Sequence, residues 1–229
     1  MTSMDVVRRV KRATGLKRVG HGGTLDPVAT GVIPICIGQA TRVMEYLVDG
    51  SKECRGVVEL GVTTDTYDSA GEVTQTADLG NLSSDQVEAA LESFHGQIDQ
   101  VPPMYSALKR DGKRLYELAR KGIEVERAPR PVNVYDIDLT DWAPPLATVE
   151  VHCGRGFYMR SLAHDMGRAL DCGGHLKSLV RLRSGPFKLQ ESVTPQELEE
   201  SFADGTWASR LHAADVVLGH LRAIIAGRR

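Results

Sequence analysis

The sequence contains few cysteines and few aromatic residues, and its longest apolar run is short. The four cysteines among 229 residues lie far apart, with no C-x-x-C pair and no two histidines at zinc-ligand spacing from each other, so neither a disulfide scaffold nor a zinc site is expected. Glycine and proline interrupt the longest apolar run, Val28 to Ile37, which argues against a membrane-spanning helix there. The N-terminus lacks the apolar core of a signal peptide. We therefore expect a cytoplasmic protein with reduced thiols, no metal and no membrane partner.

An excess of positive charge, which would indicate nucleic-acid binding, is also absent, because the formal net charge is −2. The charges are nevertheless segregated: the basic run Arg8 to Arg18 contains no acid, and further basic residues gather in Lys109 to Lys121 and Arg155 to Arg183. If these segments converge on one surface, they would bind phosphates. A single charge run is more typical of a solvated helix face.

The apolar fraction of 41% and the charged fraction of 25% are ordinary globular values. Capping patterns and apolar periodicity predict both helices and strands. The predicted elements are helices capped at Ser3, Ser83 and Thr194, strands over 54–62, 132–139 and 148–153, and a helix over 162–170 that Gly173 ends. Together they predict an α+β fold, in which a mixed β-sheet is flanked by helices.

The segment VGHGGTLDPVATGVIP, residues 19–34, places Asp26 in a glycine-rich turn. Glycine permits backbone angles that other residues avoid and lets a substrate approach the main chain. Pro27 biases Asp26 toward extended geometry. A carboxylate held in this way can act as a nucleophile or a general base, and a solvated turn aspartate is an equally good interpretation of these residues alone.

Four segments, in the same order along the chain, resemble the motifs of the TruB family, the bacterial synthases that make pseudouridine in the T loop of tRNA. They are VGHGGTLDPVATGVIP at 19–34, QVPPMYSALKRDGKRLYELARKG at 100–122, VHCGRGFYMRSL at 151–162 and LVRLRSGPF at 179–187. Four ordered motifs that span nearly the whole chain are far less prone to chance than one glycine-rich loop.

The resemblance implies a pseudouridine synthase fold and an enzyme that isomerises uridine 55 of tRNA with no cofactor and no metal. Asp26 would be the nucleophile, attacking either the anomeric carbon of the sugar or C6 of the uracil. Arg160 matches the family arginine that favours the ionised form of this carboxylate. Tyr158 matches the tyrosine that packs on the target uridine and is placed to handle a proton. We expect Tyr158 and Arg160 near the end of the strand that begins at Thr148.

The same resemblance implies an RNA-binding surface for the T arm of tRNA on a monomeric protein. His21 matches a histidine that contacts RNA near the flipped base, and Leu179 matches an apolar residue of the uracil pocket. Tyr105 and Lys109 lie in a segment that resembles the RNA-gripping part of the family. An ordinary loop histidine and a plain core leucine are the alternative interpretations of His21 and Leu179.

One departure from the family pattern concerns the site itself. Cys54 stands where the family has a tyrosine that stacks on the base, and loss of one stacking contact costs about 1 to 3 kcal/mol. The alternative function is therefore a weakly active or inactive tRNA-binding or tRNA-folding protein. A glycoside hydrolase is a more distant alternative, because no second carboxylate lies at an interpretable spacing from Asp26.

The two ends of the chain also differ from the family pattern. The family begins with an apolar strand, whereas this sequence starts at Met1-Thr2-Ser3, so we expect that first strand to be missing. Residues 188–229 are expected to form a helical tail in place of a C-terminal RNA-binding domain. The sequence thus predicts one catalytic domain over residues 1–229.

Overall fold

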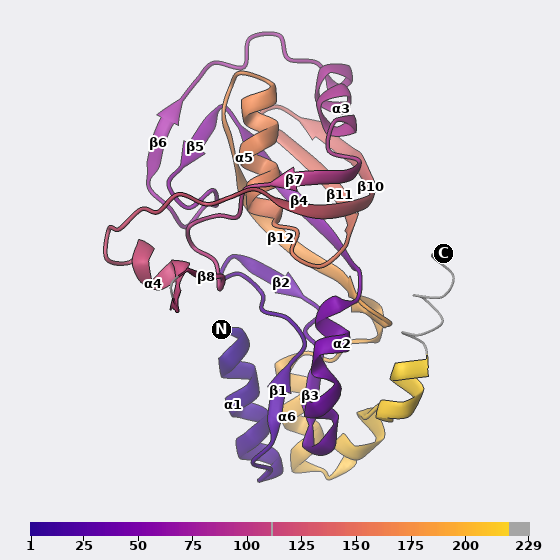
Figure 1. Ribbon diagram of the computed structural model, residues 1–229. Helices are drawn as coiled ribbons and strands as arrows, with labels where there is room; N and C mark the ends of the chain where they lie inside the picture. Colours follow the sequence, from indigo (N-terminus) through magenta and orange to yellow (C-terminus); the bar gives the residue numbers. More distant parts are fainter. Residues whose placement is uncertain (111, 220–229) are drawn as a thin grey trace. The chain divides into compact units, whose positions relative to one another are not determined.

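The computed structural model describes residues 1–110 and 112–219 (Figure 1). The chain forms two compact units, which we call the terminal unit (Met1–Glu53 with Val180–Arg229) and the central unit (Cys54–Leu179). The prediction of a single catalytic domain over 1–229 stays a prediction, and residues 220–229 of the predicted tail lie outside the described residues.

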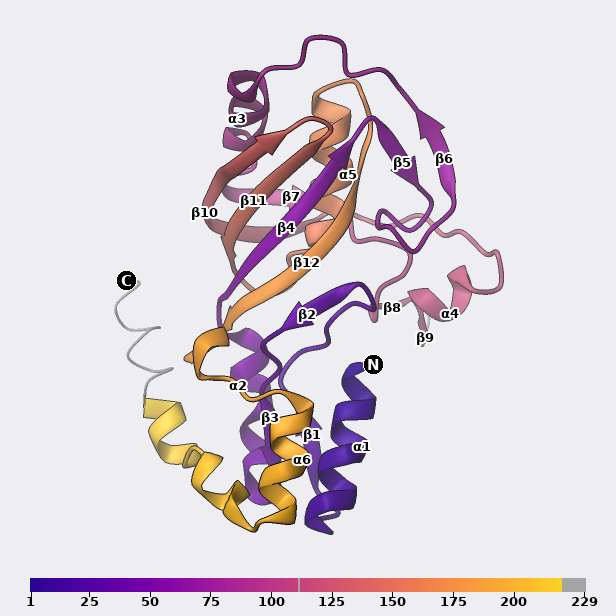
Figure 2. The ribbon, with the colours of Figure 1, turned by 180° about the vertical axis from the view of Figure 1, so that it is seen from behind.

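A mixed β-sheet with helices on one face forms the central unit. Its strands follow the order β12-β4-β11-β10-β7, and helices α3 and α5 lie on the same face of this sheet (Figures 1 and 2). The bounds are β4 Lys52–Leu60, β7 Gly96–Gln100, β10 Arg130–Ala143, β11 Leu146–Cys153, β12 Gly174–Ser184, α3 Ser84–Glu92 and α5 Met159–Ala169. The predicted α+β class, with a mixed sheet and flanking helices, is therefore confirmed.

Alternating burial explains why these segments form strands and a helix. Every second residue of β11 is buried, with Val149 and Val151 almost fully enclosed, as in a strand that covers a core on one face. Leu162 and Met166 recur at helical spacing on α5 and are completely buried. The strands predicted over 132–139 and 148–153 are confirmed, although β10 is longer than predicted.

The strand predicted over 54–62 is interrupted near its end. β4 stops at Leu60, Gly61 has a φ of 84°, and β5 (Val62–Thr64) then pairs with β6 (Val73–Thr76). Glycine is the residue that adopts such a positive φ without strain. The change of direction carries the chain into the turn of residues 65–72, which contains Asp68.

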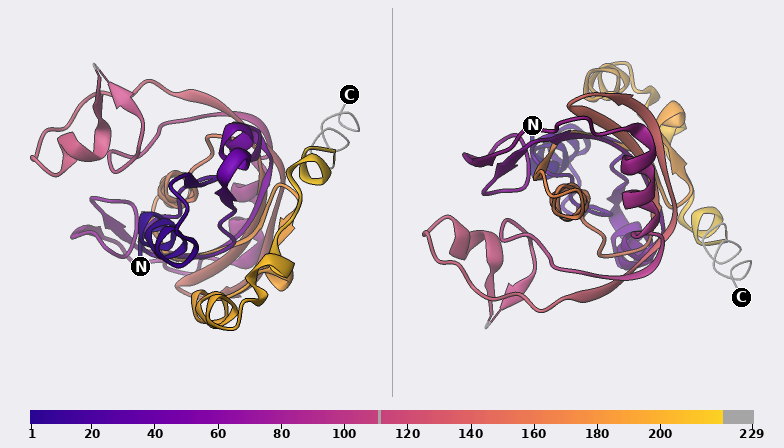
Figure 3. Two further views of the ribbon diagram at one scale, coloured as in Figure 1. Left: turned by 90° about the horizontal axis from the view of Figure 1, so that it is seen from below. Right: turned by 90° about the horizontal axis from the view of Figure 1, so that it is seen from above.

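The central unit also carries an arm that leaves the sheet (Figure 3). Strands β8 (Lys109–Arg110) and β9 (Lys113–Arg114) form a short antiparallel pair, and α4 (Leu115–Ala119) follows directly. All four strand residues are exposed and basic. The arm therefore presents a concentrated positive charge to solvent.

Two helices pack on a small β ribbon in the terminal unit. Val7 and Val10 of α1 meet Val19 of β1, and Leu198 and Phe202 of α6 pack against the same cluster. The elements are α1 Ser3–Thr14, β1 Val19–His21, β2 Ala29–Gly31, β3 Ile35–Ile37, η1 Gly38–Val43, α2 Met44–Asp49, β13 Phe187–Lys188, η2 Leu189–Glu191, α6 Pro195–Ala203 and η3 Thr206–Arg210. β1 pairs with β3, and β2 pairs with β12.

The N-cap of the first helix lies one residue earlier than predicted, and the helix itself begins at Ser3. Thr2, not Ser3, is the N-cap of α1: its hydroxyl accepts from the backbone N–H of Asp5, whose carboxylate accepts in return from the Thr2 N–H. This reciprocal pair is a capping box. The caps predicted at Ser83 and Thr194 are confirmed and form capping boxes of the same kind.

Two searches of the described residues gave negative findings. Among residues 1–110 and 112–219, no helix is long and apolar enough to cross a bilayer. Within the same described part of the chain, no group of three or more His, Cys, Asp and Glu side chains is placed to hold a metal ion.

Candidate functional site

Asp26 lies in the loop between β1 and β2 of the terminal unit, where its side chain is partly buried. Two backbone contacts fix the loop around it. The carbonyl of Asp26 accepts from the N–H of Ala29 at 2.9 Å, and the N–H of Leu25 donates to the buried hydroxyl of Ser3 at 3.0 Å. Ser3 therefore anchors this loop to the start of α1, although it does not cap the helix.

Arg181 of β12 reaches the same loop from the other side. Its side chain is only 6% exposed and donates to the carbonyls of Gly23, Thr24 and Val32. Gly23 has a φ of 119°, a conformation that favours glycine. The loop that carries Asp26 is thus held by a buried guanidinium as well as by its own backbone.

His21 ends strand β1 and is partly buried. Its Nδ1 is buried and has no hydrogen-bond partner among the described residues. Burial lowers the pKa of His21, the positive charge of Arg181 lowers it further, and a hydrogen bond with the backbone of Gly23 opposes both. The neutral imidazole is therefore favoured, and its buried nitrogen offers an unused polar group.

Arg160 lies in the first turn of α5 and is 3% exposed. Its Nη2 donates to the carbonyl of Tyr105 at 2.9 Å, and its Nε lies 3.7 Å from Oδ2 of the buried Asp68. A planar guanidinium suits such a mixed carbonyl and carboxylate environment because its donors are held in a fixed fork. One turn further along the helix, the ring of His164 stacks on Tyr67.

Tyr158 is the N-cap residue of α5, so the expected position of Tyr158 and Arg160 near the end of a strand is wrong. β11 ends at Cys153, and a short loop leads into the helix. Gln100 fixes the start of the helix, because its side-chain amide donates to the Tyr158 carbonyl at 3.1 Å and accepts from the Tyr158 N–H at 2.8 Å. Helix α5 begins at Met159, so Arg160 lies in its first turn and is oriented by the helix.

The remaining predicted pocket residues lie on neighbouring strands of the central unit. Cys54 is near the start of β4 and Leu179 is on β12, and both side chains are buried. β4 and β12 are adjacent in the sheet. Burial on adjacent strands is compatible with the predicted apolar pocket wall and equally with an ordinary core position.

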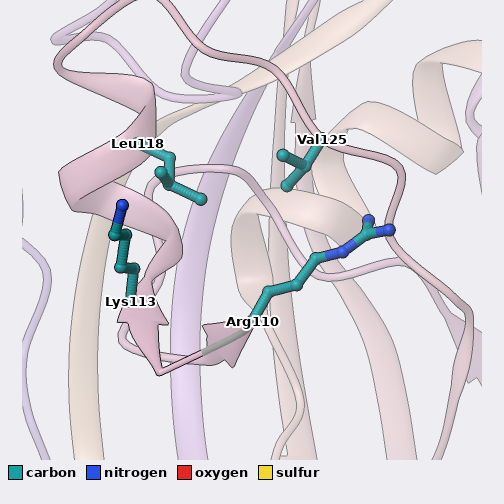
Figure 4. A pocket seen from close by; sticks show the side chains of 4 residues that line it. All are labelled: Arg110, Lys113, Leu118 and Val125. Atoms are coloured by element: carbon teal, nitrogen blue, oxygen red, sulfur yellow. The ribbon is translucent and has the colours of Figure 1, made fainter.

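The two residues predicted to grip RNA differ in their surroundings. Tyr105 is partly buried and its carbonyl holds Arg160, whereas Lys109 is exposed on β8 of the arm. The arm also contains a hollow of about 350 Å³, and Figure 4 shows the side chains of its lining: Arg110, Lys113, Leu118 and Val125. This lining of two basic and two apolar side chains is compatible with an RNA-facing surface and equally with a solvated hairpin.

Each unit carries part of the predicted site. Asp26 and His21 belong to the terminal unit, while the other predicted residues belong to the central unit. Sequence reasoning missed three residues that hold the predicted ones in place: Asp68, Gln100 and Arg181. Gln100 and Arg181 lie in segments that resemble family motifs, so a polar residue with no assigned role was the available signal there, whereas Asp68 lies outside the four segments.

Family models and relatives match almost the whole chain. Residues 11–159 match a family model described as TruB family pseudouridylate synthase (N terminal domain), and residues 160–226 match one described as tRNA pseudouridylate synthase B C-terminal domain. A Dehalococcoides mccartyi protein named tRNA pseudouridine synthase B is 49% identical over 221 residues, which cover 96% of this chain and 74% of that protein. The protein of the same name from Symbiobacterium thermophilum is 50% identical, covering 100% of this chain and 76% of its own length.

Solved structures also resemble this chain, at lower sequence identity. A chain from the crystal structure of a Cbf5-Nop10-Gar1 complex superposes with a TM-score of 0.76 at 29% identity, over 96% of this chain and 59% of that one. A chain from the structure of an H/ACA RNP bound to a substrate RNA containing 2'-deoxyuridine gives a TM-score of 0.71 at 26% identity, over 96% and 58%. This chain therefore spans less than two thirds of these structural neighbours.

Proposed function

Because this chain belongs to the TruB family of pseudouridylate synthases, we propose that it converts uridine 55 in the T loop of tRNA into pseudouridine. Relatives named tRNA pseudouridine synthase B support pseudouridine formation in tRNA as its activity. Its α+β fold is that of the pseudouridine synthases. The family match that includes the Asp26 loop is the observation that carries the proposal.

The proposed reaction is an isomerisation in which atoms and electrons balance within the nucleotide. The bond between N1 and the anomeric carbon breaks, the base turns, and a bond forms between C5 and the same sugar carbon. The proton on C5 is released, and N1 gains one. Asp26 is proposed as the nucleophile, with attack at the anomeric carbon or at C6 as the two routes.

The other predicted residues have supporting roles in this proposal. Arg160 favours the ionised form of Asp26, and Tyr158 packs on the target base. The base must leave its stack at a cost of a few kcal/mol, and His21 is proposed to contact RNA beside the vacated position. Leu179 is proposed to line the uracil pocket.

Phosphate contacts are assigned to the exposed arm and to Tyr105 beside it. Lys109 and the neighbouring basic residues of β8 and β9 are solvent-accessible, which suits binding to the sugar-phosphate backbone of the T arm. A monomeric state and a cytoplasmic location, where tRNA is available, are part of the proposal.

One specific observation favours a second function. Cys54 is buried on β4 where the family resemblance expects a stacking tyrosine, so a protein that binds or folds tRNA with little catalysis is the alternative. Such a protein would retain the basic arm and lose only the chemical step.

The proposal is tested by mapping pseudouridine in a tRNA transcript after incubation with the protein. The account expects pseudouridine at position 55 and none in a matched transcript that carries cytidine there. Modification at another uridine would contradict the proposed site, and intact binding without modification would favour the alternative.

A further inference from the structure

The guanidinium of Arg181 donates hydrogen bonds to three backbone carbonyls. Its Nε donates to the carbonyl of Val32 at 2.7 Å, and its two terminal nitrogens donate to the carbonyls of Thr24 and Gly23, each at 3.3 Å. Gly23 and Thr24 precede Asp26 in the loop, and Val32 follows it. One guanidinium thus joins both ends of the loop that carries the proposed nucleophile.

The backbone of Arg181 holds the same loop. Its carbonyl accepts from the N–H of Val32 at 2.9 Å. A Cβ at Gly31 would lie 2.3 Å from that carbonyl oxygen and 2.7 Å from the Arg181 nitrogen, a separation that atoms do not tolerate. Glycine at position 31 therefore lets β2 approach β12 closely, which brings the carbonyl of Val32, the residue after β2, within reach of the guanidinium.

Arginine is the side chain that fits this task. Hydrogen bonds from a charged donor are stronger than neutral ones, and the guanidinium directs five N–H groups in a fixed plane toward separate acceptors. A lysine ammonium at position 181 keeps the charge but has no planar fork that spans three separate carbonyls.

We propose that Arg181 is a positioning residue that fixes the Asp26 loop in its reactive geometry. This inference rests on the proposed function, in which Asp26 is the nucleophile. A displacement of a reacting group by about 1 Å can reduce a rate by about 100-fold. Loss of the three-carbonyl clamp should therefore slow the chemical step while leaving RNA binding in place.

The test compares Arg181→Lys with Arg183→Lys in the full chain. Arg183 lies two residues further along the same strand, and its guanidinium bonds to Glu53 and to the carbonyl of Gly185. Three quantities are measured: the single-turnover rate of pseudouridine formation at saturating protein, the affinity for a T-loop RNA, and the midpoint of thermal unfolding.

Arg181→Lys is expected to lower the single-turnover rate by about 10- to 100-fold, while RNA affinity stays within about threefold of wild type. Arg183→Lys is expected to keep the single-turnover rate within about threefold of wild type. This should hold even if its thermal unfolding midpoint falls as much as that of Arg181→Lys. A rate retained by Arg181→Lys, or equal rate losses in both variants, would overturn the inference.

Hydrogen exchange of backbone amides in residues 22–32 separates this inference from the proposed function. If the wild-type protein makes no pseudouridine, the proposed function fails, and the exchange result alone decides the role of Arg181. Faster exchange of this segment in Arg181→Lys than in Arg183→Lys supports the clamp. Equal exchange in the two variants overturns it.

Discussion

Arg160 and Asp68 form a buried ion pair, with Nε of the arginine 3.7 Å from Oδ2 of the aspartate and both side chains at most 5% exposed. The carboxylate is also fixed from its own loop, because its Oδ1 accepts from the hydroxyl of Thr66 at 2.7 Å and from the N–H of Ala70 at 3.0 Å. The first turn of α5 is therefore tied to a turn that lies far away in the sequence.

Removal of one partner from this pair should be costly, since it leaves the other charge buried. We expect Asp68→Asn to lower the free energy of unfolding by about 3 kcal/mol. Glu150→Gln is the matched control: Glu150 pairs with Arg55 at 2.6 Å, but both side chains are at least 35% exposed, and such pairs contribute less than about 1 kcal/mol. Urea unfolding measures both values, and equal losses would contradict the prediction.

Cys54 offers a gain-of-function prediction. Cys54→Tyr should restore a stacking contact with the target base and raise turnover by about tenfold or more, because one such contact contributes about 1 to 3 kcal/mol. Cys54→Phe supplies the ring without the hydroxyl and separates stacking from proton transfer.

A larger side chain at this buried position can also strain the core by about 1 to 3 kcal/mol. Thermal unfolding of both Cys54 variants therefore accompanies the kinetics. Well-folded variants that bind RNA without any increase in turnover would show that Cys54 does not limit the reaction.

His164 should make the stability of the central unit depend on pH. Its ring lies 3.9 Å from that of Tyr67 at an interplanar angle of 11°. Burial lowers the pKa of His164, and the charges of Arg168 and Arg127 lower it further. The unfolded histidine keeps its ordinary pKa near 6.5, so below that pH the unfolded state binds more protons than the folded state. The free energy of unfolding must therefore fall as the pH falls.

The corresponding experiment follows urea unfolding between about pH 7 and pH 5.5. Wild type should lose stability as the pH falls, and His164→Gln should show a shallower slope. His21→Gln is expected to act in the same direction, because burial also lowers the pKa of His21. An unchanged slope in His164→Gln would show that His164 does not contribute.

Gly31 and Gly38 allow a comparison of steric contact between two glycines of positive φ. Both have positive φ values, 101° and 62°, so alanine at either position costs about 1 to 2 kcal/mol in strain. Only Gly31 abuts backbone atoms, those of Arg181, whereas a Cβ at Gly38 meets no atom within 4 Å among the described residues. Gly31→Ala should therefore lower the free energy of unfolding by about 3 kcal/mol, and equal effects of the two variants would contradict this.

Prediction from the sequence was most accurate for helices and strands whose signal lies within one short segment. Ser83 with Gln86 forms the expected capping box, and the alternation in residues 148–153 becomes a strand. Helix α5 shows the limit of local patterns, because the side chain of its N-cap residue, Tyr158, makes no capping hydrogen bond to the helix. No cap signal marks its start, which explains why Arg160 was expected near the end of a strand.

Contacts between distant parts of the chain could not be predicted. The Arg160–Asp68 pair and the Arg181 clamp depend on how strands and loops are brought together, and neither has a local sequence pattern. The resemblance predicted which residues belong to a site, whereas the packing that holds them in place appeared only in the structure. The roles of Asp26, Tyr158 and the predicted RNA contacts stay predictions.

Release of tritium from C5-labelled uridine in a T-loop RNA tests whether Asp26 is the nucleophile. Formation of the bond between C5 and the sugar expels this label, so release reports completed isomerisation. We expect release by wild type and none by Asp26→Asn, with RNA affinities that agree within about threefold. Continued release by Asp26→Asn would show that Asp26 is not the nucleophile.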